Sequence, residues 1–489
     1  MPATQRRVLP ILHVLGMIVL VFGASMLAPL LLSELTLDGA QRAYDLATLI
    51  TLGTGLALWL VGRRWRRELK TRDGILLVVL TWTLLPAFAT LPLLIHLPGL
   101  SVADAYFEAM SGLTATGATV LSGLDDLPRS INLWRAQLHW IGGLGIIVLV
   151  TAVLPLLGVG GRQMFKAETP TPMKDTKLTP RMAETAKGLW LVYGLLTLAC
   201  ITVLWALGMS FFDAVVHAFS IMGLGGFSSH DASIGYFNSP PLEMAVAVFA
   251  LLAGINFATH FAALRGRRLD VYRHDPEVRW FLGFVLISGL VLALLLWQRD
   301  VFLDFPSALR YTLFNTICVS TTVGFSTTDY GHWPFFAGLW LMFLCSFSTS
   351  AGSTGGGIKM MRAVLLYKQV YRELKRLIHP EAQFPMRLGE SVVPNKVVYA
   401  VLAFMFIYVA SIVSLSFLLS FSGLDVLTAF SAVVACINNT GPGLGEVGPA
   451  HTYAVLNDFQ IWVCSFTMLL GRLELFTLLV VLTPAFWRR

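Results

Sequence analysis

One short motif recurs four times along the chain, and it constrains the fold more than any other feature of the sequence. Each copy is an apolar segment that ends in small or hydroxyl-bearing side chains around a glycine. The copies read DAYFEAMSGLTATGATV, DAVVHAFSIMGLGGFSS, YTLFNTICVSTTVGFST and TAFSAVVACINNTGPGL. Aligned on Gly117, Gly226, Gly324 and Gly441, they recur at intervals of 109, 98 and 117 residues. Repetition at a nearly constant period predicts four copies of one structural unit.

Apolar runs of bilayer length separate these copies. Only 13% of the 489 residues are charged, whereas soluble domains carry about 25%, and a spanning helix needs about 20 apolar residues. The sequence therefore predicts a polytopic membrane protein. The expected spans are 8–33, 45–62, 74–97, 133–157, 188–208, 241–264, 280–297, 334–376 (interrupted), 397–420 and 458–483. An even number of spans places both chain ends on the same side of the membrane.

The net charge of +7 follows this topology. Of the 35 lysines and arginines, 29 fall in six segments that alternate with pairs of apolar spans. These segments are 1–7, 63–72, 158–187, 265–279, 359–396 and 488–489. The distribution indicates that the basic segments and both termini face the cytoplasm. It favours a topology signal over a nucleic-acid partner.

Each repeat is expected to contain a spanning helix, a half-crossing pore helix, a non-helical return and a second spanning helix. Non-helical backbone is tolerated at membrane depth only where protein or a water-filled path surrounds it, so the four returns should converge on one axis. The predicted fold class is an all-α polytopic membrane protein with four such tandem repeats around a central pore, plus two extra N-terminal transmembrane helices. The predicted units are residues 1–72 (the two-helix domain) and 73–164, 165–275, 276–390 and 391–489 (pore repeats 1 to 4).

The returns have the composition of a cation filter. Rings of backbone carbonyls can replace the hydration shell of a potassium ion, and glycine permits positive φ at the turning point. Pore-helix dipoles add to the stabilisation of a cation if their C-terminal ends face the axis. Because the side chains of the four returns differ, the carbonyls are the expected ligands. The candidate ion-binding residues are Ala115, Thr116, Gly117, Leu224, Gly225, Gly226, Thr322, Val323, Gly324, Asn439, Thr440 and Gly441.

Three further stretches are HWIGGLGIIVLVTAVLPLLGVGG after the first return, AETPTPMKDTKLTPR, and GRLELFTLLVVLTP. With the repeats, they closely resemble the TrkH-like potassium-uptake subunits of bacteria, in the Trk/Ktr/HKT superfamily, over essentially the whole chain. In that family one filter glycine per repeat is associated with potassium preference, and serine in the first repeat marks sodium-permeable plant members. All four positions are glycine here. Two departures are Gly225, directly before Gly226, and Ala118, where repeats 2 and 3 have phenylalanine.

The stretch STSAGSTGGGIK (residues 348–359) lies inside the expected closing helix of repeat 3. Its three consecutive glycines cost about 1 kcal/mol each relative to alanine in a helix interior. A kink relieved by neighbouring helices or a cytoplasmic loop would explain them, whereas a phosphate-binding loop lacks its Gly-Lys-Ser/Thr. The resemblance implies an intramembrane gate loop that obstructs the pore beneath the filter. The residues with this implied role are Gly352, Ser353, Thr354, Gly355, Gly356 and Gly357.

Several polar residues lie within apolar spans. A charge at mid-membrane, such as Arg472, costs at least about 2.5 kcal/mol. Arg472 could pair with Glu474 or another buried acid, and the resemblance implies a compatible role as an electrostatic barrier beside the gate loop. Packing hydrogen bonds are expected for Glu108, His139, His217, His260 and Asn315. On the outer side, either cation attraction or a solvated rim is expected for Asp125, Asp126, Asp231 and Asp329.

Nothing in the sequence indicates a nucleotide-binding pocket, so control by nucleotides would require another protein. The resemblance implies a homodimer that sits on a cytosolic ring of TrkA-like nucleotide-binding subunits, and we expect those contacts at the basic loops 158–187 and 359–396. It also implies potassium as the transported ion, the bacterial inner membrane as the location, and no cofactor bound by this chain.

Two other functions compete with a potassium-uptake pore. A membrane-embedded enzyme would need clustered His, Asp or Glu, and the sequence contains no paired-carboxylate motif, HExxH or Ser-His-Asp candidate. A secondary transporter of another substrate would predict inverted repeats and broken helices at a midplane site. The four repeats of this chain share one orientation, which favours the pore.

Overall fold

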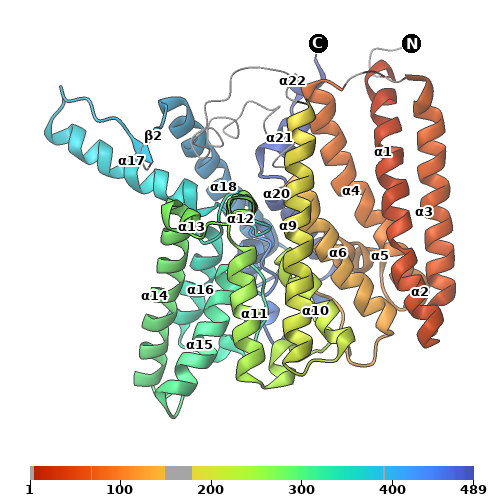
Figure 1. Ribbon diagram of the computed structural model, residues 1–489, viewed down its shortest axis with the longest axis horizontal. Coiled ribbons are helices and arrows are strands. Elements are labelled where there is room, and N and C mark those ends of the chain that lie inside the picture. The colour runs from red at the N-terminus through yellow and green to blue at the C-terminus, as the bar shows by residue number, and fades with distance from the viewer. Residues whose placement is uncertain (1–4, 66, 68, 149–178, 389–390, 489) are drawn as a thin grey trace.

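The computed structural model describes residues 5–65, 67, 69–148, 179–388 and 391–488. These residues form a bundle in which long helices run roughly in parallel, with shorter helices and coil between them (Figure 1). The N-terminal unit lies at one edge of the bundle and consists of α1 (Gln5–Ser25), α2 (Leu27–Thr36) and α3 (Gln41–Gly62). Gly16 and Gly62 let α1 and α3 approach closely, because a Cβ at either position would overlap backbone of the other helix. Small residues serve this purpose commonly between membrane helices.

Four groups of helices follow, one for each predicted repeat. The first contains α4 (Thr71–His96), α5 (Val102–Thr114) and α6 (Arg129–Val148). The second contains α9 (Thr179–Ala206), α10 (Phe211–Gly223), α11 (Pro240–Ala253), α12 (Phe257–Gly266) and α13 (Asp270–His274). The third contains α14 (Pro276–Gln298), α15 (Phe305–Ser320), α16 (Phe335–Phe347), α17 (Met360–Ile378) and the antiparallel strands β1 (Arg387–Leu388) and β2 (Ser391–Val392). The fourth contains α18 (Asn395–Phe421), α19 (Val426–Ile437), α20 (Asp458–Arg472), α21 (Phe476–Leu482) and α22 (Pro484–Trp487).

Most of the expected spans are present as helices. Among the described residues, six helices are long and apolar enough to cross a membrane, and two bent pairs raise the number to eight. The remaining two expected spans correspond to α6 and to α16 with α17. The last residues of the 133–157 span and most of loop 158–187 lie outside the described residues.

Two spans differ from the expectation of a continuous helix. The 241–264 span is bent by 94° between α11 and α12, and the 458–483 span is bent by 115° between α20 and α21. Only repeat 3 was expected to be interrupted. In repeat 2 the second half begins afresh at Asn256, whose side chain accepts a hydrogen bond from the Ala258 amide at 2.8 Å. In repeat 4, Glu474 and Leu475 both adopt φ of +53°, which ends the helix.

The four pore helices are α5, α10, α15 and α19, and each has the same kind of start. Ser101, Ser210, Asp304 and Asp425 are their N-caps, each accepting a hydrogen bond from the backbone amide three residues ahead. Such caps satisfy amides that have no partner within the helix. Three of these helices have 12 or 13 residues and α15 has 16, so at 1.5 Å per residue they are about 18–24 Å long and cannot cross a core of about 30 Å.

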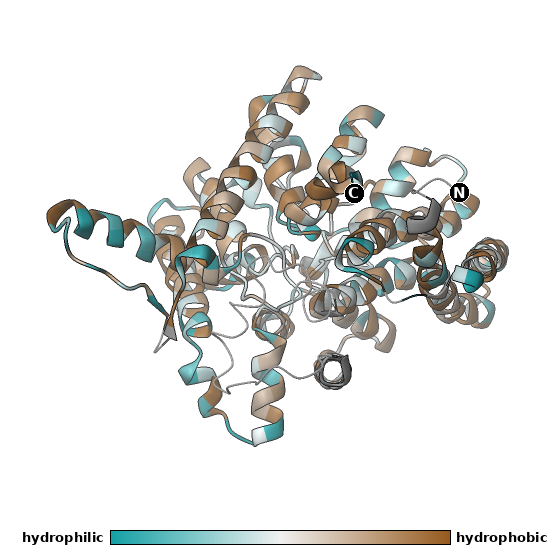
Figure 2. Cartoon of the chain, turned by 90° about the horizontal axis from the view of Figure 1, so that it is seen from above, coloured by the Kyte–Doolittle hydropathy of each residue, from teal (hydrophilic) through white to brown (hydrophobic). Residues whose placement is uncertain are grey.

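The outer surface and the centre of the bundle differ in hydropathy. Seen from above, the peripheral helices carry many strongly hydrophobic residues, while the coil at the centre is mostly pale (Figure 2). The buried residues include a large set of Ser, Thr and Asn side chains from the ends of the pore helices and the returns. This inversion, with polar groups inside and apolar groups outside, is expected of a protein whose solvent is lipid and whose polar groups line an internal site.

Candidate ion-conduction site

The four returns form a closed ring. A Cβ built on Gly117 would collide with the carbonyl oxygen of Gly225, and one on Gly226 with that of Val323. A Cβ on Gly324 would collide with the carbonyl oxygen of Thr440, and one on Gly441 with that of Thr116. All four of these separations are 2.7 Å or less. Each aligned glycine therefore packs on the carbonyl that precedes the glycine of the next repeat, and the fourth repeat closes on the first.

The backbone of the ring has the same conformation in all four repeats. The aligned glycines have φ between +75° and +95°. Two residues before each glycine, a non-glycine residue is also left-handed, with φ between +52° and +64°; these residues are Ala115, Leu224, Thr322 and Asn439. A left-handed conformation costs such a residue about 1–2 kcal/mol. Strain of this kind persists only where the surrounding structure enforces it, and it is concentrated at functional sites.

The left-handed residues end the pore helices. In repeat 1, the amides of Ala115 and Thr116 donate to the carbonyls of Gly112 and Ser111, at 3.0 and 2.8 Å. Repeats 2 and 4 have the same pair of bonds. In repeat 3 the bond that spans more residues is donated by the Gly324 amide to the Cys318 carbonyl. This is the Schellman arrangement that satisfies carbonyls at the end of a helix. It turns the chain into an extended return while the negative end of the helix dipole stays beside the ring.

Each pore helix also holds the segment that leaves the ring. In repeat 1, Glu108 accepts hydrogen bonds from the Val120 amide at 3.0 Å and from the Thr119 hydroxyl. The equivalent bonds join His217 to Ser228, Asn315 to Thr327, and Ser431 to the backbone of Leu444. The packing hydrogen bonds expected for Glu108, His217 and Asn315 are therefore present. Glu108, His217 and Asn315 each lie nine residues before their glycine, whereas Ser431 lies ten residues before Gly441 and was missed by the sequence analysis.

The brace in repeat 1 includes a buried ion pair. Arg135 Nε lies 2.8 Å from Glu108 Oε1, and both side chains are 1% exposed. The same guanidinium donates to the Ser228 carbonyl at 3.2 Å and lies 4.2 Å from the centre of the Phe227 ring. Arg135 thus joins the segment leaving the ring in repeat 1 to its counterpart in repeat 2.

The glycine-rich loop (residues 348–359) lies directly against the inner ends of the pore helices. The Thr354 hydroxyl donates to the Met222 carbonyl at 2.9 Å, and the Gly356 amide donates to the Thr322 hydroxyl at 3.1 Å. A Cβ on Gly356 would overlap the Asn438 carbonyl. The loop therefore contacts repeats 2, 3 and 4 next to the left-handed residues, on the side opposite the segments that leave the ring. Residues 353–356 are buried.

The broken helices of repeats 2 and 4 hold this loop. The Ser350 amide donates to the Gly254 carbonyl at 2.9 Å, and the Phe257 amide donates to the Gly352 carbonyl at 3.2 Å. Backbone groups that the break between α11 and α12 leaves without helical partners therefore form hydrogen bonds with the loop. From α20, Arg472 donates to the carbonyls of Thr354 and Gly142, at 2.9 and 3.0 Å.

The sequence analysis expected Arg472 to pair with a buried acid, to form a barrier beside the glycine-rich loop, or to do both. In the structure its hydrogen-bond partners are the two backbone carbonyls. Glu474, offered as its ion-pair partner, instead accepts from Arg362 at 2.5 Å. A guanidinium that is 3% exposed and directed at the backbone of the glycine-rich loop places a positive charge beneath the ring. Lys359, at the end of the loop, donates to the Gly355 carbonyl.

Glu277, which the sequence analysis did not single out, connects both ends of the glycine-rich loop. Its Oε1 atom accepts from the Ala351 amide at 2.8 Å and from the Met361 amide at 3.0 Å. The side chain is 3% exposed and comes from the first turn of α14. Because Met361 is the second residue of α17, one carboxylate ties that helix to the loop. Glu277 lies in the common helix-start sequence Asp275-Pro276-Glu277, so no functional motif identified it.

Comparison with known proteins agrees with this geometry. Residues 42–488 match the TrkH family of cation transport proteins. The chain belongs to the TrkH family. The Trk system potassium uptake protein TrkH of Salmonella typhimurium is 45% identical over 479 residues, which cover 98% of this chain and 99% of that protein. TrkH of Vibrio parahaemolyticus is 47% identical over 481 residues, with coverage of 98% and 99%. TrkG of Escherichia coli is 36% identical over 477 residues, with coverage of 97% and 98%.

A solved structure gives the same result for the TrkH-family fold. The crystal structure of the potassium transporter TrkH from Vibrio parahaemolyticus matches with a TM-score of 0.91 and 45% identity, over 98% of this chain and 99% of that one. The expected fold class, a helical polytopic membrane protein, is confirmed. Because the family consists of transport proteins, the enzyme alternative is excluded.

Three of the four outer acids of this TrkH-family chain, Asp125, Asp231 and Asp329, have structural partners. Asp125 Oδ1 lies 2.5 Å from His230 Nδ1, and Asp125 also accepts from the Asp231 amide. Burial raises the pKa of Asp125, but these hydrogen bonds outweigh it and lower the pKa below its ordinary value. Asp231 accepts from the Leu124 amide at 3.2 Å, and Asp329 from the Gly331 amide at 2.8 Å. These contacts support loop organisation at the outer face and leave the role in cation attraction a prediction.

Proposed function

We propose that this protein takes up potassium ions across the bacterial inner membrane, and that main-chain oxygens of the ring replace the water around the ion. The observation that carries the proposal is the cyclic packing of the four aligned glycines on the carbonyls of neighbouring repeats. Only a single central opening is compatible with such a closed ring. The relatives named potassium uptake proteins, at 36–47% identity, support potassium as the ion. The oxygens proposed to bind it belong to the twelve candidate residues of the four returns.

Ion flux through the purified chain in liposomes tests this proposal. Under opposed potassium and sodium gradients, we expect potassium flux to exceed sodium flux by at least about tenfold, which corresponds to 1.4 kcal/mol. Gly324→Ser should lower both the rate and the ratio, because serine must adopt a φ of +75° and its Cβ meets the Thr440 carbonyl. Equal potassium and sodium fluxes through the unaltered chain would refute the proposal.

We also propose that the glycine-rich loop is the gate and that Arg472 makes it a barrier to cations. Support comes from the buried position of residues 353–356 against three repeats and from the two carbonyls that Arg472 binds. Arg472→Gln should raise potassium flux, because it removes the charge and one of the two bonds. Arg472→Lys keeps the charge but makes fewer directed hydrogen bonds. Comparing the two variants therefore separates repulsion of the ion by the charge from attachment of the loop by hydrogen bonds. If neither variant changed the flux, the barrier role would be wrong.

Regulation by a cytosolic TrkA-like nucleotide-binding subunit is the third part of the proposal. The basic segment 359–396 supports it, since α17 presents Lys375 and Arg376 outside the buried core. Arg372 is unsuitable for the test because it is 7% exposed and donates to Asn395 at 2.9 Å. We expect Lys375→Gln with Arg376→Gln to weaken binding of the purified regulatory subunit. Arg279→Gln, an exposed cation before a different span, is the matched control.

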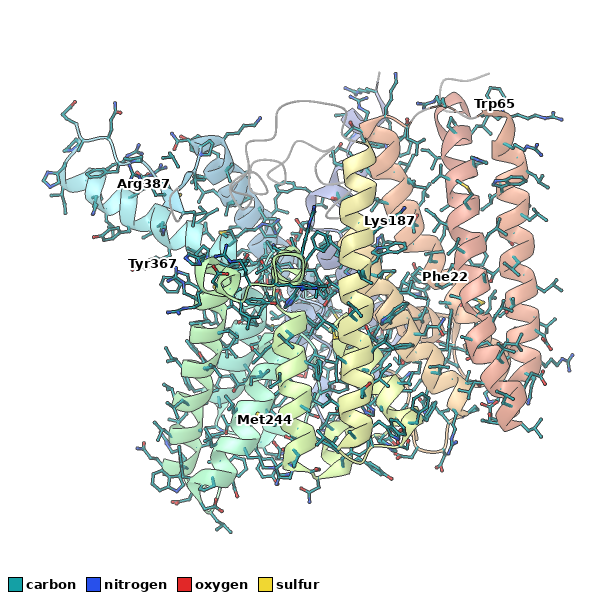
Figure 3. The ribbon with its side chains drawn as sticks, in the orientation of Figure 1. Phe22, Trp65, Lys187, Met244, Tyr367 and Arg387 are labelled. Carbon is teal, nitrogen blue, oxygen red and sulfur yellow. The ribbon has the colours of Figure 1, made fainter. Side chains whose placement is uncertain are left out.

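For the homodimer, we propose α17 as part of the contact. One face of this helix has six exposed large apolar side chains at helical spacing, between 55% and 80% exposed. They are Tyr367, Val370, Tyr371, Leu374, Leu377 and Ile378. Figure 3 shows Tyr367 and Arg387 at the end of the molecule where α17 extends away from the bundle. Tyr371→Lys with Leu374→Lys should shift the molar mass in detergent from dimer to monomer.

A further inference from the structure

Repeat 2 differs from the others at the position directly before its aligned glycine. Repeats 1, 3 and 4 carry Thr116, Val323 and Thr440 there, whereas repeat 2 carries Gly225. Glycine is not required by the backbone, because Gly225 is absent from the set of residues with positive φ. Another cause must therefore exclude a side chain at this point of the ring.

The cause is the imidazole ring of His139, which comes from α6 in repeat 1. A Cβ on Gly225 would lie 2.6 Å or less from three atoms of that ring. This separation is shorter than a real Cβ contact allows, so the histidine occupies the volume that a threonine or valine fills in the other repeats. The side chain of one repeat thus takes the place of a missing side chain in the next.

Several contacts fix this imidazole in position. It stacks on Phe227, with ring centres 4.2 Å apart and planes inclined by 20°. Its Nδ1 atom accepts from the Phe227 amide at 3.4 Å and lies 3.3 Å from the Ser220 hydroxyl. The residue is 0% exposed. Phe227 and Ser220 lie on either side of Gly225, so the ring is held to the segments that enter and leave this part of the site.

His139 is also connected, through Gly225, to the return of repeat 1. The carbonyl oxygen of Gly225 is the atom on which Gly117 packs. Displacement of the imidazole would let Gly225 move, and movement of its carbonyl would change the contact with Gly117. The other three repeats have no equivalent dependence on an imidazole from a neighbouring repeat among the contacts described above.

We propose that His139 is a positioning residue for ion selectivity, which sets the location of the Gly225 carbonyl by filling the space beside it. This inference rests on the proposed function, because it assumes that the ring selects the ion. The alternative is a histidine that only packs the core, and its replacement would then lower stability without changing the ratio of potassium to sodium flux.

The test is a size-exchange experiment on the full chain in liposomes. The variants are Gly225→Thr, His139→Ala and the double variant, with the melting temperature measured in parallel. A threonine at position 225 would overlap the imidazole and displace the backbone or the ring, so Gly225→Thr should lower potassium flux by about tenfold or more. His139→Ala should lower the potassium-to-sodium ratio by a similar factor, because Gly225 is then free to move. In the double variant the threonine occupies the vacated space, and flux and ratio should recover most of the loss.

Two further variants make the result decisive. His139→Phe keeps a stacking ring of similar size without the nitrogen, and it should preserve more of the ratio than His139→Ala. His260→Ala removes another buried histidine, which bonds Tyr272 and the Leu252 carbonyl, and it should leave the ratio unchanged. Independent effects of the two substitutions, or a ratio unaffected by His139→Ala in folded protein, would overturn the inference. Failure of the unaltered chain to prefer potassium would instead refute the proposed function.

Discussion

The ring of aligned glycines and the glycine-rich loop lie next to each other, yet they are held in different ways. The ring has four copies of one backbone conformation, and its contacts between repeats are largely main-chain packing. The loop occurs once, in repeat 3, and the side chains of Glu277, Arg472 and Lys359 bind its backbone. Both regions are rich in glycine, and in both the glycines permit positive φ and close packing; only the ring repeats one such arrangement four times.

This difference indicates which region can move. Every element of the ring is enclosed by the next repeat, so displacement of one return would disturb all four. The loop is held by a limited set of hydrogen bonds, to Glu277, Arg472 and the backbone of Gly254 and Phe257, and a bond with a charged partner contributes about 1.5–3 kcal/mol. We therefore propose that the ring is the rigid selective element and that the loop is the obstruction that is released.

The largest effect is expected from alanine at the aligned glycines. Positive φ costs alanine about 1–2 kcal/mol and the clash with a carbonyl about 1–3 kcal/mol more. We expect Gly117→Ala, Gly226→Ala and Gly324→Ala to lower potassium flux by about a hundredfold, at 1.4 kcal/mol per factor of ten. Gly441→Ala should be the mildest of the four, since its separation from the carbonyl is the largest. Flux assays on the four variants check the order, and normal flux for any of the first three would contradict a closed ring.

The next largest effect concerns the ion pair behind the ring. Glu108→Gln leaves Arg135 as a buried charge without its partner, which costs about 3–5 kcal/mol. We expect a clear fall in melting temperature together with a lower potassium-to-sodium flux ratio. Glu243→Gln is the matched control, because Glu243 in repeat 2 is also buried and is paired with Arg310 of repeat 3. If Glu108→Gln destabilised the protein but left the ratio intact, the brace would be structural only.

Glu277→Gln should instead affect the loop and spare the ring. Loss of the charge weakens two hydrogen bonds that join Ala351 and Met361, and loss of a charged hydrogen bond is worth about 1.5–3 kcal/mol. We expect flux without any regulatory subunit to rise by about tenfold or more, with the potassium-to-sodium ratio unchanged. Glu277→Asp keeps a carboxylate but shortens the side chain, so its flux should lie between those of the unaltered chain and Glu277→Gln. A changed ratio would show that ring and loop are not separable.

The sequence predicted the ring far better than the loop's surroundings, for a physical reason. Repetition marked the four glycines, and a polar side chain within an apolar segment marked Glu108, His217 and Asn315, because both are local features of the sequence. The breaks before Asn256 and at Glu474, the role of Glu277 and the packing of His139 against Gly225 depend on contacts between residues distant in the sequence. The breaks carried weak signals, Gly254 two residues before Asn256 and Glu474 two residues after Arg472, which periodicity alone could not distinguish from continuous helices.

The smallest effect is expected at the start of a pore helix, away from both regions. The hydroxyl and amide of Thr428 lower the pKa of Asp425 below its ordinary value of 3.8. The stabilisation from the charged cap is therefore present above pH 3.8 and is lost as the pH falls through the lowered pKa. Asp425→Ala should cost about 1 kcal/mol, and Asp425→Asn should keep most of the cap without the pH dependence. Melting temperatures between pH 7 and pH 3 compare the three proteins. Flux ratios should not change, because all four pore helices end in the same ring contacts; a changed ratio would mean that the start of a pore helix, and not only its end, positions the ring.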